Sequence, residues 1–348
     1  MSVTAISSVG APRPGLKPSM RRLWVVAFVS ALAASACSGS SGSTGPLASS
    51  GCSIGGQQQC ALPTDPAAST ATGGTPQLLA LGSAADGEVG LWKLGASRAW
   101  QKVEAIPDAR AIARNGAFVS IAHPTSLETR PIGALDKTGA GVALTWTVTT
   151  PSAPIVAIDR SIMGSTAIAA SDEGGLTYGI ASPDGAVIQL QGAPADSFTP
   201  LVAWLDQDQI LVLSTGKDQA SRLVAVNVSK RTSVTVQRLT GVRWFALSWD
   251  YKTVAAATGS GVYLGGASTW LGGGSPTQII ALGESQIVWQ LALNQHGTQL
   301  AMLSGTLAVD GTVTGIRELG YTKTGASWSK TYDQPVPFTT CLGQVWID

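Results

Sequence analysis

The side chains that most often carry out catalysis are scarce in this sequence. It holds two histidines, His123 and His296, and no His-Glu-x-x-His, P-loop, Gly-x-Ser-x-Gly or dinucleotide-binding pattern. His296 stands in a Gln-His-Gly turn, which favours a structural role. His123 follows an expected strand and precedes Pro124, so its loop is either structural or faces a binding site. The sequence therefore does not favour an enzyme, and it predicts no cofactor.

Acidic residues gather in two expected turns, at 172–173 and 206–208. Neither turn has the alternating acids and the terminal glutamate of a calcium-binding loop. Cys52 and Cys60 enclose seven residues without a nearby histidine, which is not the spacing of a zinc site. We therefore expect these turns to be solvated, and we expect no metal site.

Cys37, the first of the four cysteines, follows a segment with the features of a signal peptide. An uncharged apolar run of 14 residues, 23–36, follows Arg21 and Arg22 and ends in small residues. The run is short for a membrane-spanning helix and has the length of a signal-peptide core. The segment Ala34-Ser35-Ala36-Cys37 resembles the lipobox of bacterial lipoproteins, with Ala34 where that family usually has leucine. The resemblance implies that Cys37 is lipidated; the alternative is an ordinary secretory signal cleaved near Ala36.

The residues around this signal predict three regions. Residues 1–36 form the signal peptide, and either translation starts at Met20 or residues 1–19 are an extension of it. Residues 37–76 are rich in Ser, Gly and Pro and predict a flexible tether. Residues 77–348 remain for the folded domain. Ser38 directly after Cys37 is, by the lipoprotein resemblance, compatible with sorting to the outer membrane of a diderm cell.

An exported protein can form disulfides, and Cys52–Cys60 is the expected pair because its loop closes easily. The competing pair is Cys60–Cys341, which would join the two ends of the folded domain. Residues 77–348 hold 18 basic and 20 acidic residues, because four basic residues and Asp65 lie before them. A slightly acidic domain has no electrostatic footprint for a phosphate backbone, so nucleic acid is not expected as a partner.

An internal repeat of about 45 residues organises the folded domain. Each copy has a short apolar strand, a tight polar turn and a second strand rich in Ala, Val and Leu. Taking Ala111, Ala157, Ala203, Leu247 and Leu291 as equivalent gives steps of 46, 46, 44 and 44 residues. Third and fourth strands follow in each unit, for example at 175–180 and 186–190. Four strands at this period predict a β-propeller blade.

Dividing residues 77–348 by the repeat length predicts six blades, with seven as the alternative. Residues 77–106 supply three strands, at 77–81, 88–94 and 99–104, without a first strand before them. The C-terminal segment 343–347 supplies one more. The sequence therefore predicts an all-β, six-bladed propeller closed by pairing of its N- and C-terminal strands, which removes open sheet edges.

The repeat also resembles a known group of propellers. The segments 247–252 and 292–301 are similar to the strand–turn–strand pattern of WD-repeat-like and TolB-like propellers. The Ser-Pro-Asp-Gly turn of that pattern occurs here at 182–185, between the third and fourth strands of its unit. The resemblance implies the propeller fold, and a fold of this kind serves many functions.

Binding residues are expected on the funnel face, which is built by the loops between second and third strands and by the loops between blades. The candidates there are Asp108, Arg110, Asp172, Asp196, Arg243 and Glu284. Among the tryptophans, Trp204, Trp249 and Trp346 are expected to pack between blades. Trp270, beside a glycine run, is expected to be exposed in a loop.

These observations predict a lipid-anchored propeller of the cell envelope that binds a protein or glycan without catalysis. Its membrane contact would be the lipid on Cys37. One alternative is a hydrolase or lyase acting on sugar or cell-wall fragments, which would need a histidine–acid pair or several carboxylates converging in the funnel. Another is an envelope-assembly factor.

Overall fold

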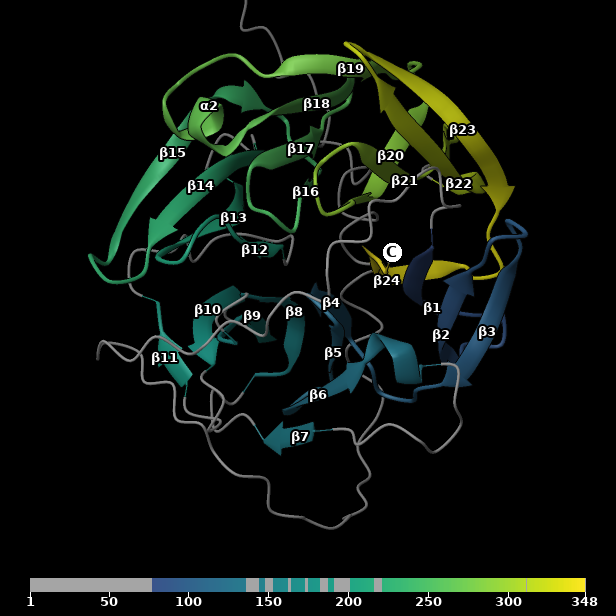
Figure 1. Ribbon diagram of the computed structural model, residues 1–348, viewed down its shortest axis with the longest axis horizontal. Coiled ribbons are helices and arrows are strands. Elements are labelled where there is room, and N and C mark those ends of the chain that lie inside the picture. Colours follow the sequence, from purple (N-terminus) through teal and green to yellow (C-terminus); the bar gives the residue numbers. More distant parts are fainter. Residues whose placement is uncertain are drawn as a thin grey trace, which may run out of the picture. The chain divides into compact units, whose positions relative to one another are not determined.

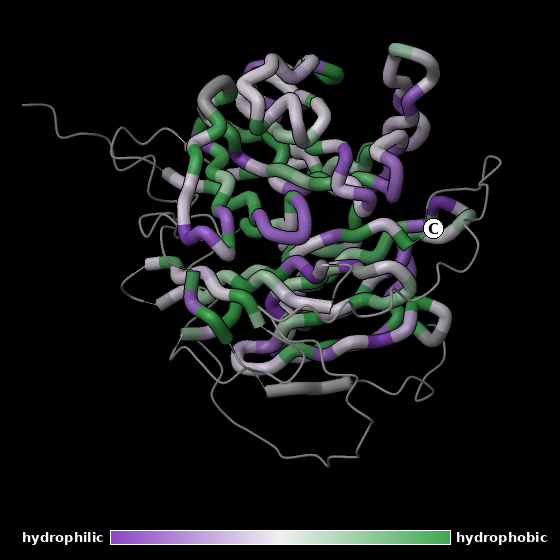
Figure 2. The backbone as a smooth tube through the Cα atoms, turned by 60° about the vertical axis from the view of Figure 1, so that its left-hand side comes forward, coloured by the Kyte–Doolittle hydropathy of each residue, from purple (hydrophilic) through white to green (hydrophobic). Residues whose placement is uncertain are grey.

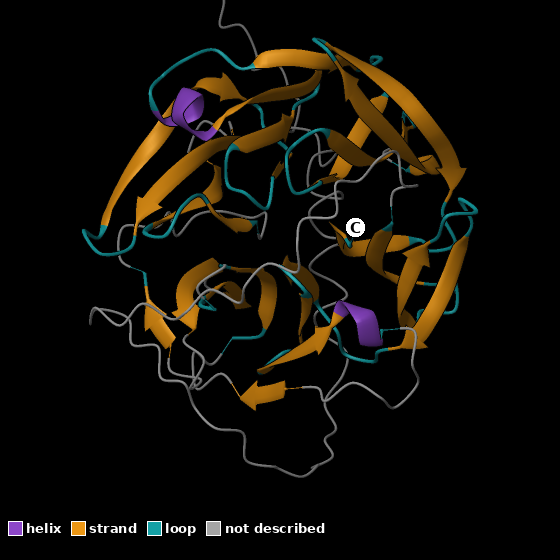
Figure 3. Cartoon of the chain, viewed as in Figure 1, coloured by secondary structure: helices purple, strands orange, loops and turns teal. Residues whose placement is uncertain are grey.

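Six four-stranded antiparallel sheets make up the described part of the chain (Figure 1). The computed structural model describes residues 77–135, 144–147, 153–161, 164–172, 175–181, 187–190, 201–215, 221–310 and 312–347. Strands and turns account for nearly all of them, and the helical segments are short (Figure 3). The prediction of an all-β propeller with six blades is confirmed.

The blades are numbered in chain order, and their strands are given from the innermost to the outermost. Blades 1 to 3 are β24 (Thr340–Trp346), β1 (Leu78–Ser83), β2 (Val89–Leu94) and β3 (Trp100–Ala105); β4 (Ala111–Asn115), β5 (Phe118–Ala122), β6 (Ser126–Pro131) and β7 (Leu144–Thr147); and β8 (Ile155–Arg160), β9 (Thr166–Asp172), β10 (Gly175–Ala181) and β11 (Val187–Gln189).

Blades 4 to 6 are β12 (Val202–Trp204), β13 (Gln209–Thr215), β14 (Ser221–Asn227) and β15 (Thr232–Thr240); β16 (Trp244–Leu247), β17 (Thr253–Ala257), β18 (Gly261–Gly266) and β19 (Thr277–Ala281); and β20 (Gln286–Leu293), β21 (Gln299–Leu307), β22 (Val313–Thr324) and β23 (Ser327–Pro335). A 3-10 helix, η3 (Ile132–Ala134), follows β6, and a short helix, α2 (Ala267–Leu271), follows β18.

The ring closes as the sequence predicts. The innermost strand of each blade lies beside that of the next, and β24 lies beside both β20 and β4. β24 pairs with β1, with Trp346 opposite Leu78 and Thr340 opposite Ser83. The register shifts at Gly82, where a Cβ atom would lie 2.7 Å from the Phe338 ring. Strands from both ends of the described chain therefore share blade 1.

The hydrophobic core is divided among the seams between neighbouring blades. In β1, Leu79 and Leu81 belong to the cluster shared with blade 2, whereas Leu78 and Ala80 belong to clusters shared with blade 6. Alternate side chains of a strand point to opposite faces, so a strand packed between two blades is apolar at every position. Figure 2 shows these hydrophobic stretches in green along the strands.

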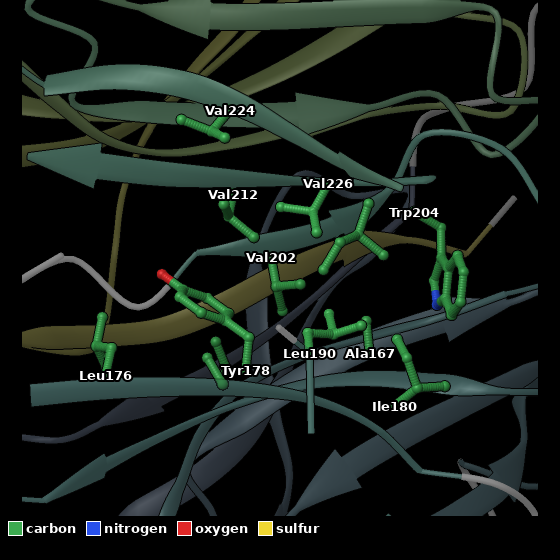
Figure 4. Close-up of a cluster of buried hydrophobic side chains, with 13 residues drawn as sticks. Ala167, Leu176, Tyr178, Ile180, Leu190, Val202, Trp204, Val212, Val224 and Val226 are labelled. Carbon is green, nitrogen blue, oxygen red and sulfur yellow. The ribbon is translucent and has the colours of Figure 1, made fainter. Parts of the chain in front are cut away.

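The seam between blades 3 and 4 shows the packing in detail (Figure 4). Tyr178 and Ile180 of β10 face Val202 and Trp204 of β12 across it. Trp204 and Trp346 are 3% and 2% exposed and belong to seam clusters, which confirms their predicted place between blades.

The expectation for Trp270 was wrong. Trp270 lies in α2 and is 2% exposed, within the cluster between blades 4 and 5. Its indole covers Gly265 of β18, where a Cβ atom would approach the indole nitrogen to 3.0 Å. The glycines on either side of Trp270 allow the chain to fold back onto the blade instead of projecting into solvent. Trp270 is therefore a core residue and does not anchor a partner.

Candidate functional site

Four of the six predicted binding residues are described with their side chains, and all four lie on the funnel face. Asp108 and Arg110 lie between β3 and β4, Arg243 precedes β16, and Glu284 lies between β19 and β20. Asp108, Arg243 and Glu284 are exposed, and Arg110 is half-buried. They occupy three different loops between blades, so the structure spreads them around this face instead of gathering them at one point.

Hydrogen bonds of the main chain hold two of these loops in place. The N–H of Arg110 donates to the Ala122 carbonyl at 2.7 Å, and the N–H of Arg243 donates to the Ala257 carbonyl at 2.8 Å. Asp172 ends β9, opposite Gly175, and its side chain lies outside the described residues, as does all of Asp196. A binding role for these six residues remains a prediction.

A charged cluster that the sequence analysis missed lies between blades 1 and 2. This Arg130 cluster consists of Glu104 on β3, His123 in the loop after β5, and Glu128 and Arg130 on β6. Arg130 forms ion pairs with both Glu104 and Glu128. His123 Nε2 lies 3.4 Å from Glu128 Oε2. The side chains are 31% (Glu104), 22% (His123 and Arg130) and 10% (Glu128) exposed.

The alternation of β6 explains how the cluster forms. Leu127 belongs to the apolar cluster between blades 2 and 3, so Glu128 and Arg130 face the opposite way, toward blade 1. Partial burial lowers the pKa of Arg130 by desolvation, and its one positive charge faces the two carboxylates of Glu104 and Glu128. The glutamate–arginine spacing of two in an expected strand was the signal available in the sequence, because such residues share one face.

The Arg130 cluster joins two blades, which predicts a stability role that can be measured. Arg130→Met should lower the free energy of unfolding by about 1–3 kcal/mol, because it leaves two partly buried carboxylates without a cation. Arg130→Lys should lose less, since it keeps the charge and lacks the planar fork. Urea unfolding of the two variants tests this, and an unchanged midpoint for Arg130→Met would contradict it.

The opposite end of the ring, the hairpin face, carries the turns between first and second strands. Here Trp249, in the turn between β16 and β17, lies over Arg114 of β4, with 5.8 Å from the guanidinium carbon to the ring centre. Arg114 also donates to the carbonyls of Gly116 (2.9 Å) and Trp346 (2.8 Å). Gly116 has a φ of +54°, and a Cβ atom there would lie 3.2 Å from the indole.

Trp249 therefore does not pack between neighbouring blades, contrary to its prediction. It belongs to blade 5, and Arg114 belongs to blade 2, which stands opposite in the ring. The same turn reaches blade 6 through the N–H of Asp250, which donates to the Gln295 carbonyl at 3.1 Å. Tyr251 packs against the cluster between blades 3 and 4. Because this turn contacts blades on several sides of the axis, side chains cross the axis at the hairpin face.

One histidine–acid pair lies at the edge of the funnel face. His123 is in the loop between the second and third strands of blade 2, and Glu128 lies on the third strand β6 and faces blade 1. Within the described ranges, no group of three or more His, Cys, Asp or Glu side chains is placed to hold a metal ion. The arrangement supports ion pairing between blades and a polar funnel face.

The cysteine predictions are tested only in part. Cys341 on β24 is a free, half-buried thiol whose Sγ lies 3.4 Å from the Gly343 carbonyl oxygen, and its alternative partner Cys60 lies outside the described residues. Cys37, Cys52 and Cys60 lie outside the described residues, so lipidation and the Cys52–Cys60 pair remain predictions. In the part of the chain that is described, no helix has the length and hydropathy to cross a membrane.

Comparison with known proteins identifies the fold. No protein-family model matches the chain, and no curated protein matches it significantly. Among solved structures, TolB from Acinetobacter baumannii superposes with a TM-score of 0.56 at 11% identity, over 79% of this chain and 67% of that one. A putative TolB from Agrobacterium tumefaciens gives a TM-score of 0.49 at 14% identity, over 75% and 90% of the two chains. Likeness at this identity shows the fold alone: the chain folds as a six-bladed β-propeller, as its repeat predicts.

Proposed function

We propose that the protein is a lipid-anchored propeller of the cell envelope that binds a protein or glycan partner on its funnel face without catalysis. The observation that carries the proposal is the difference between the two ends of the ring. The hairpin face is crossed by the Trp249–Arg114 contact, whereas the funnel face presents Asp108, Arg243 and Glu284 to solvent. A partner that approaches the axis therefore meets the funnel face.

The place of Gln77, where the predicted tether would join the propeller, supports this orientation. Gln77 accepts a hydrogen bond from the N–H of Ile347 at 3.0 Å, beside Trp346 and thus on the hairpin face. If residues 38–76 act as the predicted tether, a chain of that length would span roughly 35 Å on average. Under the proposal, an anchor at Cys37 would leave the funnel face on the side away from its attachment and within reach of envelope partners.

Site-specific photocrosslinking tests the binding face. A photoreactive amino acid at Asp108, Arg243 or Glu284 should give the same adduct in intact cells. Matched exposed positions on the hairpin face, Arg98 and Lys252, should give little of it. Mass spectrometry and protease digestion distinguish a protein from a glycan adduct. Adducts of equal yield at both faces, or only at the hairpin face, would contradict the proposal.

Metabolic labelling with an alkyne fatty acid tests the anchor. Two or more acyl chains hold a protein stably on a membrane, at about 0.8 kcal/mol per buried methylene. Label should enter the wild type and be lost almost completely in Cys37→Ser, whose signal segment should stay uncleaved. Cys341→Ser is the matched control and should keep the label. Equal label in the wild type and Cys37→Ser would defeat the anchor.

Two alternatives predict different outcomes of the same experiments. For an envelope-assembly factor, the funnel-face adduct would contain components of outer-membrane machinery. For a hydrolase or lyase, the His123–Glu128 pair is the one supporting observation, and turnover of sugar or cell-wall fragments would be lost in Glu128→Gln. Turnover that survives in this variant would count against the pair as a catalytic site.

A further inference from the structure

A buried acid lies in the seam where the ring closes. Glu318 of β22 is fully buried, with 0% of its surface exposed. Its neighbour Leu319 belongs to the cluster between blades 5 and 6, so Glu318 points the other way, toward blade 1. Gln344 of β24, itself 6% exposed, extends into the same seam from the closing strand, and its amide donates to the Ala301 carbonyl at 3.4 Å.

Three side-chain oxygen atoms of Glu318 and Gln344 in this seam lack a well-formed hydrogen bond. Both carboxyl oxygens of Glu318 and Oε1 of Gln344 are buried and have no hydrogen-bond partner among the described residues. The Gln344 side chain and the main chain of Met302 lower the pKa of the Glu318 carboxyl by less than burial raises it, and neither forms a hydrogen bond of good geometry to it. A buried carboxylate without a donor or cation is costly, because desolvation is not compensated.

Protonation of Glu318 would remove this cost, since a neutral carboxylic acid carries no charge and is itself a hydrogen-bond donor. We propose that Glu318 is protonated in the folded protein and that its O–H bonds to Gln344 Oε1, so that one proton fastens blade 6 to the closing strand β24. This proton latch would satisfy two of the three orphaned oxygens with one hydrogen bond. It would also make closure of the ring depend on pH.

The groups around Glu318 favour its protonated form. Burial raises the pKa of Glu318 well above its usual range. From β24, the Cys341 thiol faces it, and burial first and the Glu318 charge second raise the pKa of that thiol. From β23, the buried Tyr332 faces the same seam, and from β20 the Gln290 amide donates to the Cys341 carbonyl at 3.4 Å. No lysine, arginine or histidine within the described ranges forms an ion pair with Glu318.

The sign of the pH dependence follows from the bound proton. The unfolded chain releases this proton near the ordinary glutamate pKa of about 4.3, whereas the folded chain keeps it. Stability from the latch is therefore complete below that pH and falls as pH rises, by tenfold in the folding equilibrium per pH unit, until Glu318 ionises in the fold. The buried Asp159 of β8 and the unfolded Cys341 thiol, whose pKa is about 8.5, also titrate between pH 7 and 8.5, so Glu318 is identified by the difference in slope between the wild type and a variant that lacks it.

The test is urea unfolding of the full chain between pH 5 and 8.5. Across pH 7–8.5 the loss of stability with pH should be steeper in the wild type than in Glu318→Gln by one proton per molecule. Glu318→Gln should be more stable at pH 7.5, by up to about a thousandfold in the folding equilibrium. Glu284→Gln, which changes an exposed glutamate, should keep the wild-type slope. Identical slopes in the wild type and Glu318→Gln would overturn the latch.

Infrared spectroscopy keeps the proposal testable if Glu318→Gln fails to fold. The wild type at pH 8 should show the C=O band of a protonated carboxylic acid, and glutamate carrying carbon-13 in its carboxyl group should shift that band. Hydrogen exchange adds a local readout at the same pH, where the β24 amides of a folded Glu318→Gln should exchange more slowly than those of the wild type. A wild type without the acid band, or with a band that survives in Glu318→Gln, would overturn the proposal.

Discussion

A chain truncated after Phe338 is expected to lose the cooperative unfolding transition of the propeller. Truncation removes β24, so β1 loses its inner partner and the seams on both sides of blade 1 lose Trp346 and Ile347. Deleting one large buried aromatic side chain costs about 3–5 kcal/mol, against a typical domain stability of 5–15 kcal/mol. Circular dichroism during urea unfolding should show a broad, non-cooperative change.

A rearranged chain provides the matched control. Because the N–H of Ile347 bonds to the Gln77 carbonyl, residues 339–348 can be moved to precede Gln77 through a two-glycine link. This chain keeps every strand of blade 1 and turns β24 and β1 into a hairpin. It should recover a cooperative transition. If the truncated chain unfolds with the wild-type midpoint, β24 does not close the ring.

Asp159→Asn is expected to stabilise the protein at neutral pH and to leave it unchanged near pH 4. Asp159, on the innermost strand β8, accepts the Trp204 main-chain N–H at 2.7 Å, and burial raises its pKa to about 7. The unfolded value is about 3.9, so the folded chain holds this proton more tightly. Stability is therefore complete below pH 4 and is lost as pH rises to about 7, by up to about 4 kcal/mol.

Asparagine removes this titration and keeps an oxygen that can accept the Trp204 N–H. Urea unfolding at pH 4, 7 and 8 should show equal stability at the first pH and a gain for Asp159→Asn at the other two. Asp86→Asn, at an exposed turn, is the control and should match the wild type throughout. A loss at pH 7 for Asp159→Asn would mean that the ionised carboxylate stabilises the fold.

The propeller architecture could be predicted because the same pattern of strands and turns repeats along the sequence at a nearly constant spacing. The 44- and 46-residue steps find the innermost strands β4, β8, β12, β16 and β20, although Ala111 begins its strand and Leu247 ends its own. The three unmatched strands after residue 76 require β24 as their fourth. Apolar runs such as 78–81 follow from packing on both faces of a blade. These patterns are local, so they can be recognised in a single sequence.

The contacts that could not be predicted from the sequence depend on which neighbouring blade each face of a strand packs against. Nothing in the sequence around Trp249 shows that its turn reaches Arg114 on the opposite blade. Alternation places Glu128 and Arg130 on one face, but their partner Glu104 is more than 20 residues away on another blade. Glu318 looks like an exposed strand residue until β24 covers it. Asp108, Arg110, Arg243 and Glu284 lie in loops between blades because a loop's position in the repeat decides its end of the ring, and their binding role stays a prediction.

Closure of the ring by β24 also affects when the chain can finish folding during its synthesis. Blade 1 cannot be completed until residues 340–346 are present, although its other three strands are made first. Contacts between segments this far apart form late and slow the search for the native state. If the chain is exported as we propose, β1 to β3 stay without their inner partner during synthesis. The strand order that closes the finished ring would thus keep the nascent chain incompletely folded, as passage through a membrane translocation pore requires.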